Sequence, residues 1–190
     1  MNSVCRFMIY KTQGIIIKKT DLAEADRLLT VYTKDFGKIL VKAKAVKKSQ
    51  AKLKGHLELF LCSHLMLAQG KSVDIITSAE TIESFPCLRR GLNPLAAAYY
   101  LSELIDKLIV GPEKDKEIWD LLLLSFQELD ALKPEVLKIS QNFERKLLEF
   151  LGYDLSGQSA KKDPLSFIRS LVGEKINSET FLKKTAFMLR

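Results

Sequence analysis

Residues 38 to 55 read KILVKAKAVKKSQAKLKG, with seven lysines and no acidic residue. From 38 to 46, apolar and basic residues alternate, and Leu40 is the exception. The apolar set is Ile39, Val41, Ala43 and Ala45, and the basic set is Lys38, Lys42 and Lys44. A period of two predicts a β-strand with one face on a core and the other in water. The lysines then continue into the following connection with Lys47, Lys48, Lys52 and Lys54.

The rest of the first 85 residues also favours strands. Segments 14–17, 28–33, 57–68 and 73–77 have strand character, and continuation of the last one to Ile82 is left open. Asp35-Phe36-Gly37 predicts a hairpin turn between the second and third strands. Five short strands in so short a stretch are typical of a small barrel or sandwich, and a five-stranded Greek-key barrel is the economical choice.

The period changes to helical after Phe85 and Pro86. We predict a first helix capped by Asn93 and ending before Gly111, and a second through 118–129. A third begins at Pro134 and stops at Gly152. A short helix then runs from Asp163-Pro164 to near Gly173, and a last one is capped by Ser178. The boundary between the halves lies near 81–92, so we expect domains at 1–84 and 85–190.

All the net charge lies in the first part of the chain. Of the formal +7, residues 1–80 contribute 14 Lys and Arg against 7 Asp and Glu, and residues 81–190 contribute 16 against 16. Such asymmetry indicates a polyanionic partner, either nucleic acid or an anionic membrane surface. Residues 1–7 are too short and polar for a signal peptide, and no apolar run is long enough to span a membrane.

Enzymatic and metal chemistry find little support. Cys5, Cys62 and Cys87 are widely spaced, and His56 and His64 complete no ligand set, so we expect reduced thiols in a cytosolic protein, two of them buried. Phosphate-binding glycine loops and the G-x-S-x-G motif are absent from the sequence. The acidic group Asp21, Glu24 and Asp26 is interpreted as a solvated turn. We therefore predict no catalytic residue, metal or cofactor.

Two interpretations of the lysine segment remain open. The first is a solvated basic face. The second is a nucleic-acid surface, because small barrels bind single strands along one face through lysine–phosphate contacts and aromatic stacking. No acid lies between Phe36 and Leu57, so the repulsion is expected to be uncompensated. The candidate aromatic platforms are Tyr10, Tyr32, Phe36 and Phe60, with core packing favoured for Phe36 and Phe60.

Three stretches in order resemble one known family. They are Asp26-Arg27-Leu28 with TKDFG at 33–37, AKAVKKSQAKL at 43–53, and FERKLLEFLGY at 143–153. Residues 97–108, AAYYLSELIDKL, are also similar to that family's first long helix. These motifs resemble the RecO family of DNA repair proteins over residues 8 to 153. Met8 resembles the usual start, which makes residues 1–7 an extension or a misplaced start.

The resemblance implies an OB-fold barrel followed by a helical domain, an α+β chain in which the strands come first. It implies a non-enzymatic, bacterial, cytoplasmic and nucleoid-associated protein that binds single- and double-stranded DNA and anneals complementary strands. It also implies that RecR is a partner and that the helical domain binds the tail of single-strand-binding protein. RecA is implied as an indirect partner. The expected DNA-binding residues are Arg27, Lys38, Lys42, Lys44, Lys47, Lys48, Lys52 and Lys54.

The chain departs from the family pattern at three points. The family glycine before the basic pair is Ala45, and the family arginine is Lys47, which keeps the charge without the planar fork. No cysteine follows Cys87, so the four-cysteine zinc site of many relatives is not expected. Two other functions stay open, a protein-binding adaptor and an RNA-binding OB-fold protein.

Overall fold

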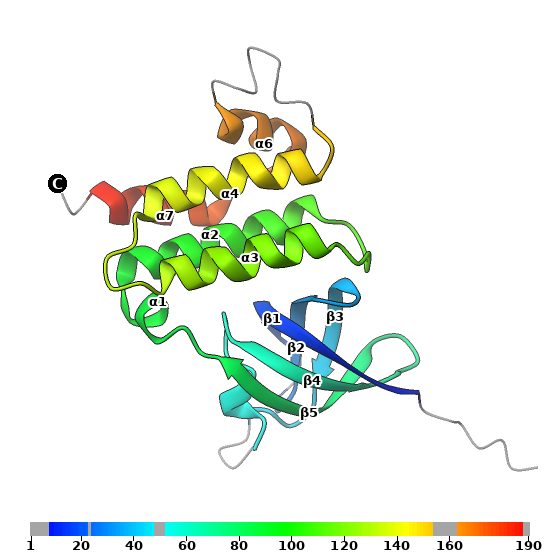
Figure 1. Cartoon of the computed structure of the whole chain (residues 1–190). Coiled ribbons are helices and arrows are strands. Elements are labelled where there is room, and N and C mark those ends of the chain that lie inside the picture. Colours follow the sequence, from blue (N-terminus) through cyan, green and yellow to red (C-terminus); the bar gives the residue numbers. More distant parts are fainter. Residues whose placement is uncertain (1–7, 23, 48–51, 154–162, 188–190) are drawn as a thin grey trace, which may run out of the picture. The chain divides into compact units, whose positions relative to one another are not determined.

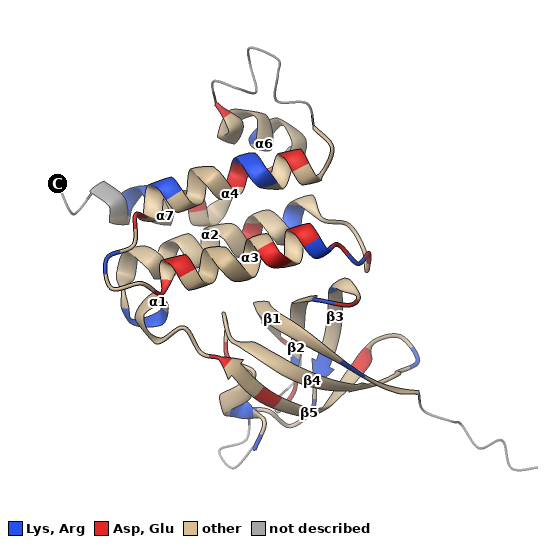
Figure 2. Cartoon of the chain, in the orientation of Figure 1, with Lys and Arg blue, Asp and Glu red and all other residues tan. Residues whose placement is uncertain are grey.

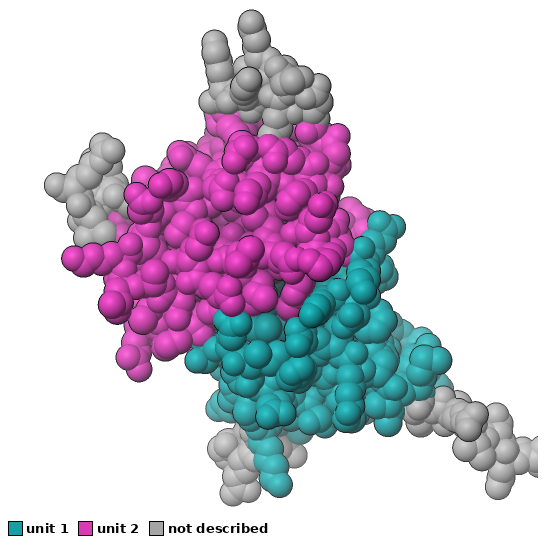
Figure 3. Space-filling view, in the orientation of Figure 1, with its two compact units in different colours: residues 1–84, 111–114 teal, residues 85–110, 115–190 magenta. Residues whose placement is uncertain are grey.

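The computed structural model describes residues 8–22, 24–47, 52–153 and 163–187. The chain divides into two compact units, which Figure 3 colours separately. Unit 1 comprises Met1–Ser84 with Gly111–Lys114, and unit 2 comprises Phe85–Val110 with Asp115–Arg190. The short stretch Gly111–Lys114 therefore belongs to the first unit, although it connects two helices of the second.

Unit 1 is a closed five-stranded barrel (Figure 1). The strands are β1 Ile9–Asp21, β2 Arg27–Thr33, β3 Gly37–Ala43, β4 Cys62–Ala68 and β5 Asp74–Glu83. Their order around the barrel is β1-β2-β3-β5-β4, with β3 and β5 parallel and the other pairs antiparallel. A 3-10 turn, η1 Lys54–His56, lies between β3 and β4. The predicted five-stranded barrel, followed by helices, is confirmed.

The barrel closes because β1 is long enough to pair with two neighbours. Its 13 residues pair with β2 over Gly14–Asp21 and with β4 over Ile9–Ile15. The register shifts between Ile16 and Lys18, and such a bulge bends a strand and increases its twist. Alternate residues of all five strands fill the interior, among them Ile16, Val31, Val41, Leu67 and Ile76.

Two predicted strands are shorter in the structure. The strand predicted at 38–46 ends at Ala43, because Ala45 takes a left-handed backbone conformation with φ 53°. The strand predicted at 57–68 begins only at Cys62, since the chain turns at Phe60, where φ is 64°. The backbone N–H of Phe60 donates to the Ile16 carbonyl, 2.9 Å away. Leu57 precedes β4 and still packs in the barrel core. The alternating leucines at 57–61 therefore indicated burial and not a strand.

The predicted turn between β2 and β3 is confirmed and is held by side-chain hydrogen bonds. Thr33 Oγ1 donates to the Gly37 carbonyl at 2.9 Å and accepts from the backbone N–H of Phe36 at 3.1 Å. Gly37 has φ 62°, and a Cβ there would stand 2.0 Å from the carbonyl oxygen of Glu113. Only glycine fits this position, for conformation and for space.

Unit 2 is helical (Figure 1). Its helices are α1 Pro86–Arg90, α2 Leu92–Leu108, α3 Lys116–Leu129, α4 Val136–Phe150, α6 Pro164–Val172 and α7 Asn177–Phe187. The helix predicted from Asp163-Pro164 is confirmed as α6, and Asp163 is its N-cap, because its side chain accepts from the N–H of Ser166. The Asn93 cap was wrong, since α2 begins at Leu92 with Gly91 as N-cap. The third helix begins at Val136 rather than at Pro134.

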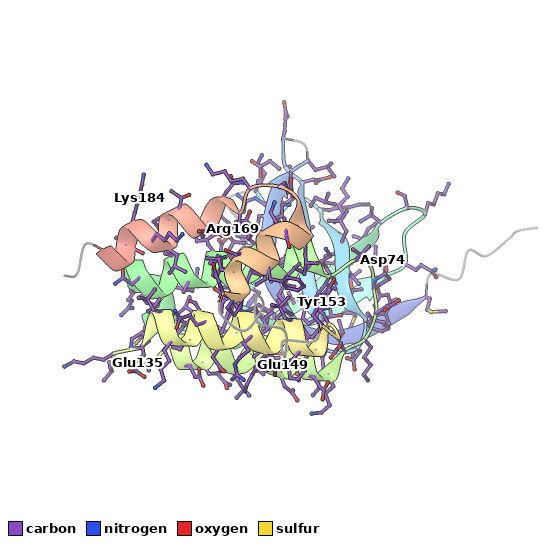
Figure 4. All side chains as sticks on the ribbon, turned by 90° about the horizontal axis from the view of Figure 1, so that it is seen from above. Asp74, Glu135, Glu149, Tyr153, Arg169 and Lys184 are labelled. Atoms are coloured by element: carbon purple, nitrogen blue, oxygen red, sulfur yellow. The ribbon has the colours of Figure 1, made fainter. Side chains whose placement is uncertain are left out.

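The predicted cap at Ser178 was also wrong, because Ser178 is the second residue of α7. The side chain that serves this end belongs to Glu103 of α2, which accepts from the backbone N–H groups of Asn177 and Ser178 at 3.0 and 2.8 Å. A carboxylate here satisfies donors that a helix start leaves unpaired. In Figure 4, Arg169 is labelled on α6, from which it forms an ion pair with Glu179 of α7.

The two helical stretches that resembled the family meet inside unit 2. The Tyr100 hydroxyl of α2 donates to Glu144 Oε1 of α4 at 2.8 Å, and both residues are buried. The end of α4 has the two hydrogen bonds of a Schellman motif, Tyr153 N–H to Leu148 and Gly152 N–H to Glu149. Gly152 has φ 82°, which explains the glycine that precedes Tyr153.

Candidate nucleic-acid interface

The basic residues predicted on the third strand lie on the outer face of β3. Val41 and Ala43 are buried in the barrel, whereas Lys38, Leu40 and Lys42 are partly or largely exposed. Lys38 and Lys42 are four residues apart, which is roughly 13 Å along a strand. Lys38 pairs with Tyr32 near the hairpin and Lys42 with Leu28 near the opposite end of β2. Figure 2 shows basic residues on β3 and along the chain that follows it.

The structure brings three of the predicted cations together with two carboxylates at one end of β2 and β3. Arg27 Nε lies 3.1 Å from Asp21 Oδ1, and Lys47 Nζ lies 3.2 Å from Asp21 Oδ2. Lys42 Nζ lies 2.8 Å from Asp26 Oδ2. We call Arg27, Lys42 and Lys47 with Asp21 and Asp26 the ion-pair cluster.

Asp26 also fixes the backbone around the cluster. Its Oδ1 accepts from the N–H of Ala45 at 2.8 Å, and its carbonyl accepts from the N–H of Leu22 at 3.3 Å. The N–H of Lys47 donates to the carbonyl of Ala25 at 3.1 Å. These bonds tie the β1–β2 connection to the chain that leaves β3. Asp26 therefore holds the backbone at Ala45 and pairs directly with Lys42, while the Ala25 carbonyl holds the backbone at Lys47.

The charges perturb both carboxyl groups in the same direction. Hydrogen bonds from Lys47 and then Arg27 lower the pKa of Asp21 below its ordinary value. A hydrogen bond from Lys42, and then one from the Ala45 N–H, lowers the pKa of Asp26. Both groups are thus anions at neutral pH, and each faces lysine or arginine.

These contacts correct two expectations. The lysine segment is not uncompensated, and the acidic group is not merely a solvated turn, because Asp21 and Asp26 neutralise part of the segment. Sequence reasoning missed this because the carboxylates precede the lysines by 16 to 26 residues, across the β2–β3 hairpin. The signal was present in the register: Arg27 pairs with Ala43, which brings the start of β2 beside the end of β3.

The other predicted residues extend the positive surface. Lys44, Lys52 and Lys54 have exposed side chains, whereas Lys48 lies outside the described residues. We define the cationic surface as the described members of the predicted set: Arg27, Lys38, Lys42, Lys44, Lys47, Lys52 and Lys54. This surface holds seven cations, and the ion pairs of Asp21 and Asp26 neutralise only part of them, so a positive excess remains.

Aromatic side chains contribute less than expected. Tyr32 and Phe60 are fully buried, so neither offers a face for stacking. Phe36 was expected in the core but is 37% exposed, and its ring meets Tyr10 edge-on at 4.9 Å. Tyr10 is held by its hydroxyl, which donates to Asp74. Leu40, 47% exposed between Lys38 and Lys42, is the apolar group that β3 itself presents. Charge rather than stacking dominates this face.

The cysteine and histidine residues have structural surroundings. Cys62 is buried, which raises the pKa of its thiol to about 12 and leaves it unreactive at neutral pH. Cys87 is only partly buried, and Cys5 lies outside the described residues, so the expectation of two buried thiols holds for Cys62 alone among those described. His56 Nδ1 accepts from the backbone N–H of Thr81 at 3.3 Å, which ties η1 to β5.

Two further features follow from the described residues. Within these ranges, His, Cys, Asp and Glu form no group of three or more that could hold a metal ion. None of the described helices has the length and apolar character needed to cross a membrane.

Ala45 carries a backbone strain that glycine would relieve. Its φ of 53° costs an L-residue about 1–2 kcal/mol, partly offset by the freedom that glycine adds to the unfolded chain. We expect Ala45→Gly to stabilise the protein by roughly 0.5–1 kcal/mol in urea unfolding followed by circular dichroism. Ala25→Gly is the control, because Ala25 lacks a positive φ and the change should destabilise. Equal losses of stability in both variants would contradict this account.

Fold and charge together define a class: an OB-fold barrel with a cationic outer surface, joined to a helical unit. The sequence matches the family models described as Recombination protein O N terminal, over residues 8–85, and Recombination protein O C terminal, over residues 89–160. The chain belongs to the RecO family of DNA repair proteins. The family resemblance is thereby confirmed.

Individual bacterial relatives agree with this assignment. The chain is 42% identical over 144 residues to the DNA repair protein RecO of Dehalococcoides mccartyi, covering 76% of this chain and 56% of the relative. It is 37% identical over 148 residues to that of a Roseiflexus species, covering 78% and 52%. The match to Trichodesmium erythraeum is 35% over 147 residues, covering 77% and 50%. The chain spans about half the length of these curated relatives.

The three relatives share one name. Each of the three relatives is named a DNA repair protein, and none of those names states a catalytic activity.

Proposed function

We propose that this protein binds single- and double-stranded DNA through the cationic surface of unit 1 and anneals complementary strands. The observation that supports the proposal most is the gathering of Lys42, Lys44 and Lys47 with Arg27 at one end of β2 and β3. OB-folds bind oligonucleotides on the face of strands 2 and 3 and the adjoining loops. Membership in a family of DNA repair proteins also supports DNA as the ligand.

The proposed mechanism is electrostatic. Lysines bound to phosphates neutralise the backbones of two strands, which lowers their mutual repulsion and lets the strands approach. Base pairing then supplies the sequence specificity, which phosphate contacts do not carry. The shortage of exposed aromatic groups fits this division, because the bases stay available for pairing instead of being stacked on the protein.

We also propose protein partners for this chain, on the basis of its family. Residues 1–84 act as the DNA-binding domain, and residues 85–190 act as the helical, zinc-free partner domain. With RecR, the protein helps RecA to load on DNA coated by single-strand-binding protein, whose tail the helical domain contacts. Because the chain spans about half of its relatives' length, each of these contacts is proposed separately from DNA binding.

The test is an annealing assay with two complementary oligonucleotides that carry a donor and an acceptor dye. At about 50 mM salt we expect the protein to accelerate the appearance of energy transfer at least about tenfold, and this acceleration should disappear as salt screens the contacts. Non-complementary strands serve as the control and should give no transfer.

Two results would contradict the proposal. Absence of acceleration at low salt would exclude annealing. Strong preference for a matched RNA competitor over DNA would favour the RNA-binding alternative instead.

A further inference from the structure

The ion-pair cluster places two carboxylates against three cations of the proposed DNA-binding surface. Asp21 spans two cations, contacting Arg27 through Oδ1 and Lys47 through Oδ2. Its side chain is 61% exposed, whereas those of Arg27 and Lys47 are 25% and 27% exposed. A carboxylate and a phosphate each present two oxygens that can accept hydrogen bonds from a pair of cations. Asp21 therefore uses the two cations that a phosphate could also contact.

Asp26 contacts one cation and uses its other oxygen for a backbone hydrogen bond. Oδ2 contacts Lys42 at 2.8 Å, while Oδ1 is committed to the N–H of Ala45. Its side chain is less exposed than that of Asp21, at 22% against 61%. Asp26 is thus anchored to the backbone, and Asp21 is the carboxylate that is able to move away from its partners.

We propose that Asp21, assisted by Asp26, is an internal counterion of the cationic surface. The two carboxylates compete with nucleic-acid phosphate for Arg27, Lys42 and Lys47. This competition sets how weakly and reversibly the protein binds DNA. This inference rests on the proposed function and adds a regulating residue to the same surface. A strand that binds must displace the carboxylate from Arg27 and Lys47, and the carboxylate returns when the strand leaves.

Competition by Asp21 should change the salt dependence of DNA binding, whereas an acidic residue outside the cluster should not. The salt dependence of binding reports how much positive charge the protein brings to the phosphates, with a slope of about 0.7 per contact on single strands. When a strand displaces Asp21 from Arg27 and Lys47, the freed carboxylate takes up about one cation from solution, which offsets one of the counterions released from the DNA. Removing the carboxylate should therefore steepen the slope of log K against log salt by about 0.7, not merely raise affinity.

The experiment measures fluorescence anisotropy of a labelled single-stranded oligonucleotide across a salt series. Asp21→Asn removes the charge and keeps the shape, and we expect about fivefold tighter binding at 0.1 M salt together with the steeper slope. Asp21→Glu restores the charge and should return both quantities to those of the natural chain. Asp26→Asn keeps an oxygen for the Ala45 N–H and should give a change in the same direction.

Glu24→Gln is the matched control. Glu24 is exposed on the same connection and takes part in none of the three ion pairs. Its removal changes net charge equally but displaces no counterion from the cluster, so the slope should not change. Thermal unfolding of each variant checks that the barrel is intact.

The outcomes separate the inference from the proposed function. A steeper slope for Asp21→Asn and Asp26→Asn, with no change for Glu24→Gln, supports the counterion. Equal tightening by Asp21→Asn and Glu24→Gln, or no change for either while the natural chain binds, overturns it. If the natural chain and all variants fail to bind at low salt, the proposed DNA binding fails, and the counterion role fails with it.

Discussion

Raising the pH from about 4.5 to 8 is expected to weaken the helical unit by about 3 kcal/mol through one buried side chain, Glu144. Glu144 is 6% exposed and accepts a hydrogen bond from the Tyr100 hydroxyl. Its pKa is raised from 4.5 to about 7, chiefly by burial.

The groups around Glu144 act in opposite directions on its pKa. Tyr100 of α2 lowers it by hydrogen bonding, and Arg169 of α6 lowers it by charge. Asp163 at the start of α6 and Glu179 of α7 raise it. Burial remains the largest cause, so the folded unit prefers the protonated acid.

The direction of the pH effect follows from this preference. In the unfolded chain Glu144 ionises near 4.5, whereas in the folded chain it keeps its proton up to about pH 7. The contribution to stability is therefore complete below pH 4.5, falls between 4.5 and 7, and is lost above 7. The shift of about 2.5 pKa units corresponds to the figure of about 3 kcal/mol.

Urea unfolding from pH 4 to 8 measures the effect, with fluorescence of Trp119 as the probe. Trp119 is the single tryptophan of the chain and is buried in α3 of unit 2. Glu144→Gln stays neutral and keeps an acceptor for Tyr100, so it should match the natural chain near pH 4 and exceed its stability at pH 8. A stability difference between the two proteins that does not vary with pH would refute the assignment.

The second large effect concerns DNA binding. Changing Lys44, Lys47, Lys52 and Lys54 to Ala is expected to weaken binding to a single-stranded oligonucleotide about 100-fold or more at 0.1 M salt. Four lost phosphate contacts, at about 0.7 each, lower the slope of log K against log salt by about 3. We expect no loss of fold, because Lys44, Lys52 and Lys54 are exposed and Lys47 pairs with the exposed Asp21.

Much of the fold was predictable because its signals are local. Period-two alternation from Ile39 to Ala43, the TKDFG turn and the helical stripes each depend on neighbours in sequence, and each matched an observed element. Where prediction failed, a tertiary contact decided. Phe60 turns the chain to hydrogen-bond with Ile16, and the start of α7 is served by Glu103 from another helix.

The candidate site divides in the same way. The lysines were found from composition, and their outward direction on β3 was found from periodicity. The counterions were not, because Asp21 and Asp26 reach Lys42 and Lys47 only through the antiparallel register of β2 and β3. Aromatic exposure also depended on tertiary packing, which buries Tyr32 and leaves Phe36 at the surface.

The most direct test of the central claim, that the cationic surface of unit 1 binds DNA, is oligonucleotide anisotropy across a salt series with three proteins. They are the natural chain, the Lys44, Lys47, Lys52 and Lys54 variant, and a control with Lys133, Lys138, Lys183 and Lys184 of unit 2 changed to Ala. The account predicts a steep slope for the natural chain and the control, and loss of affinity and slope for the unit 1 variant. Equal binding by all three proteins would contradict it.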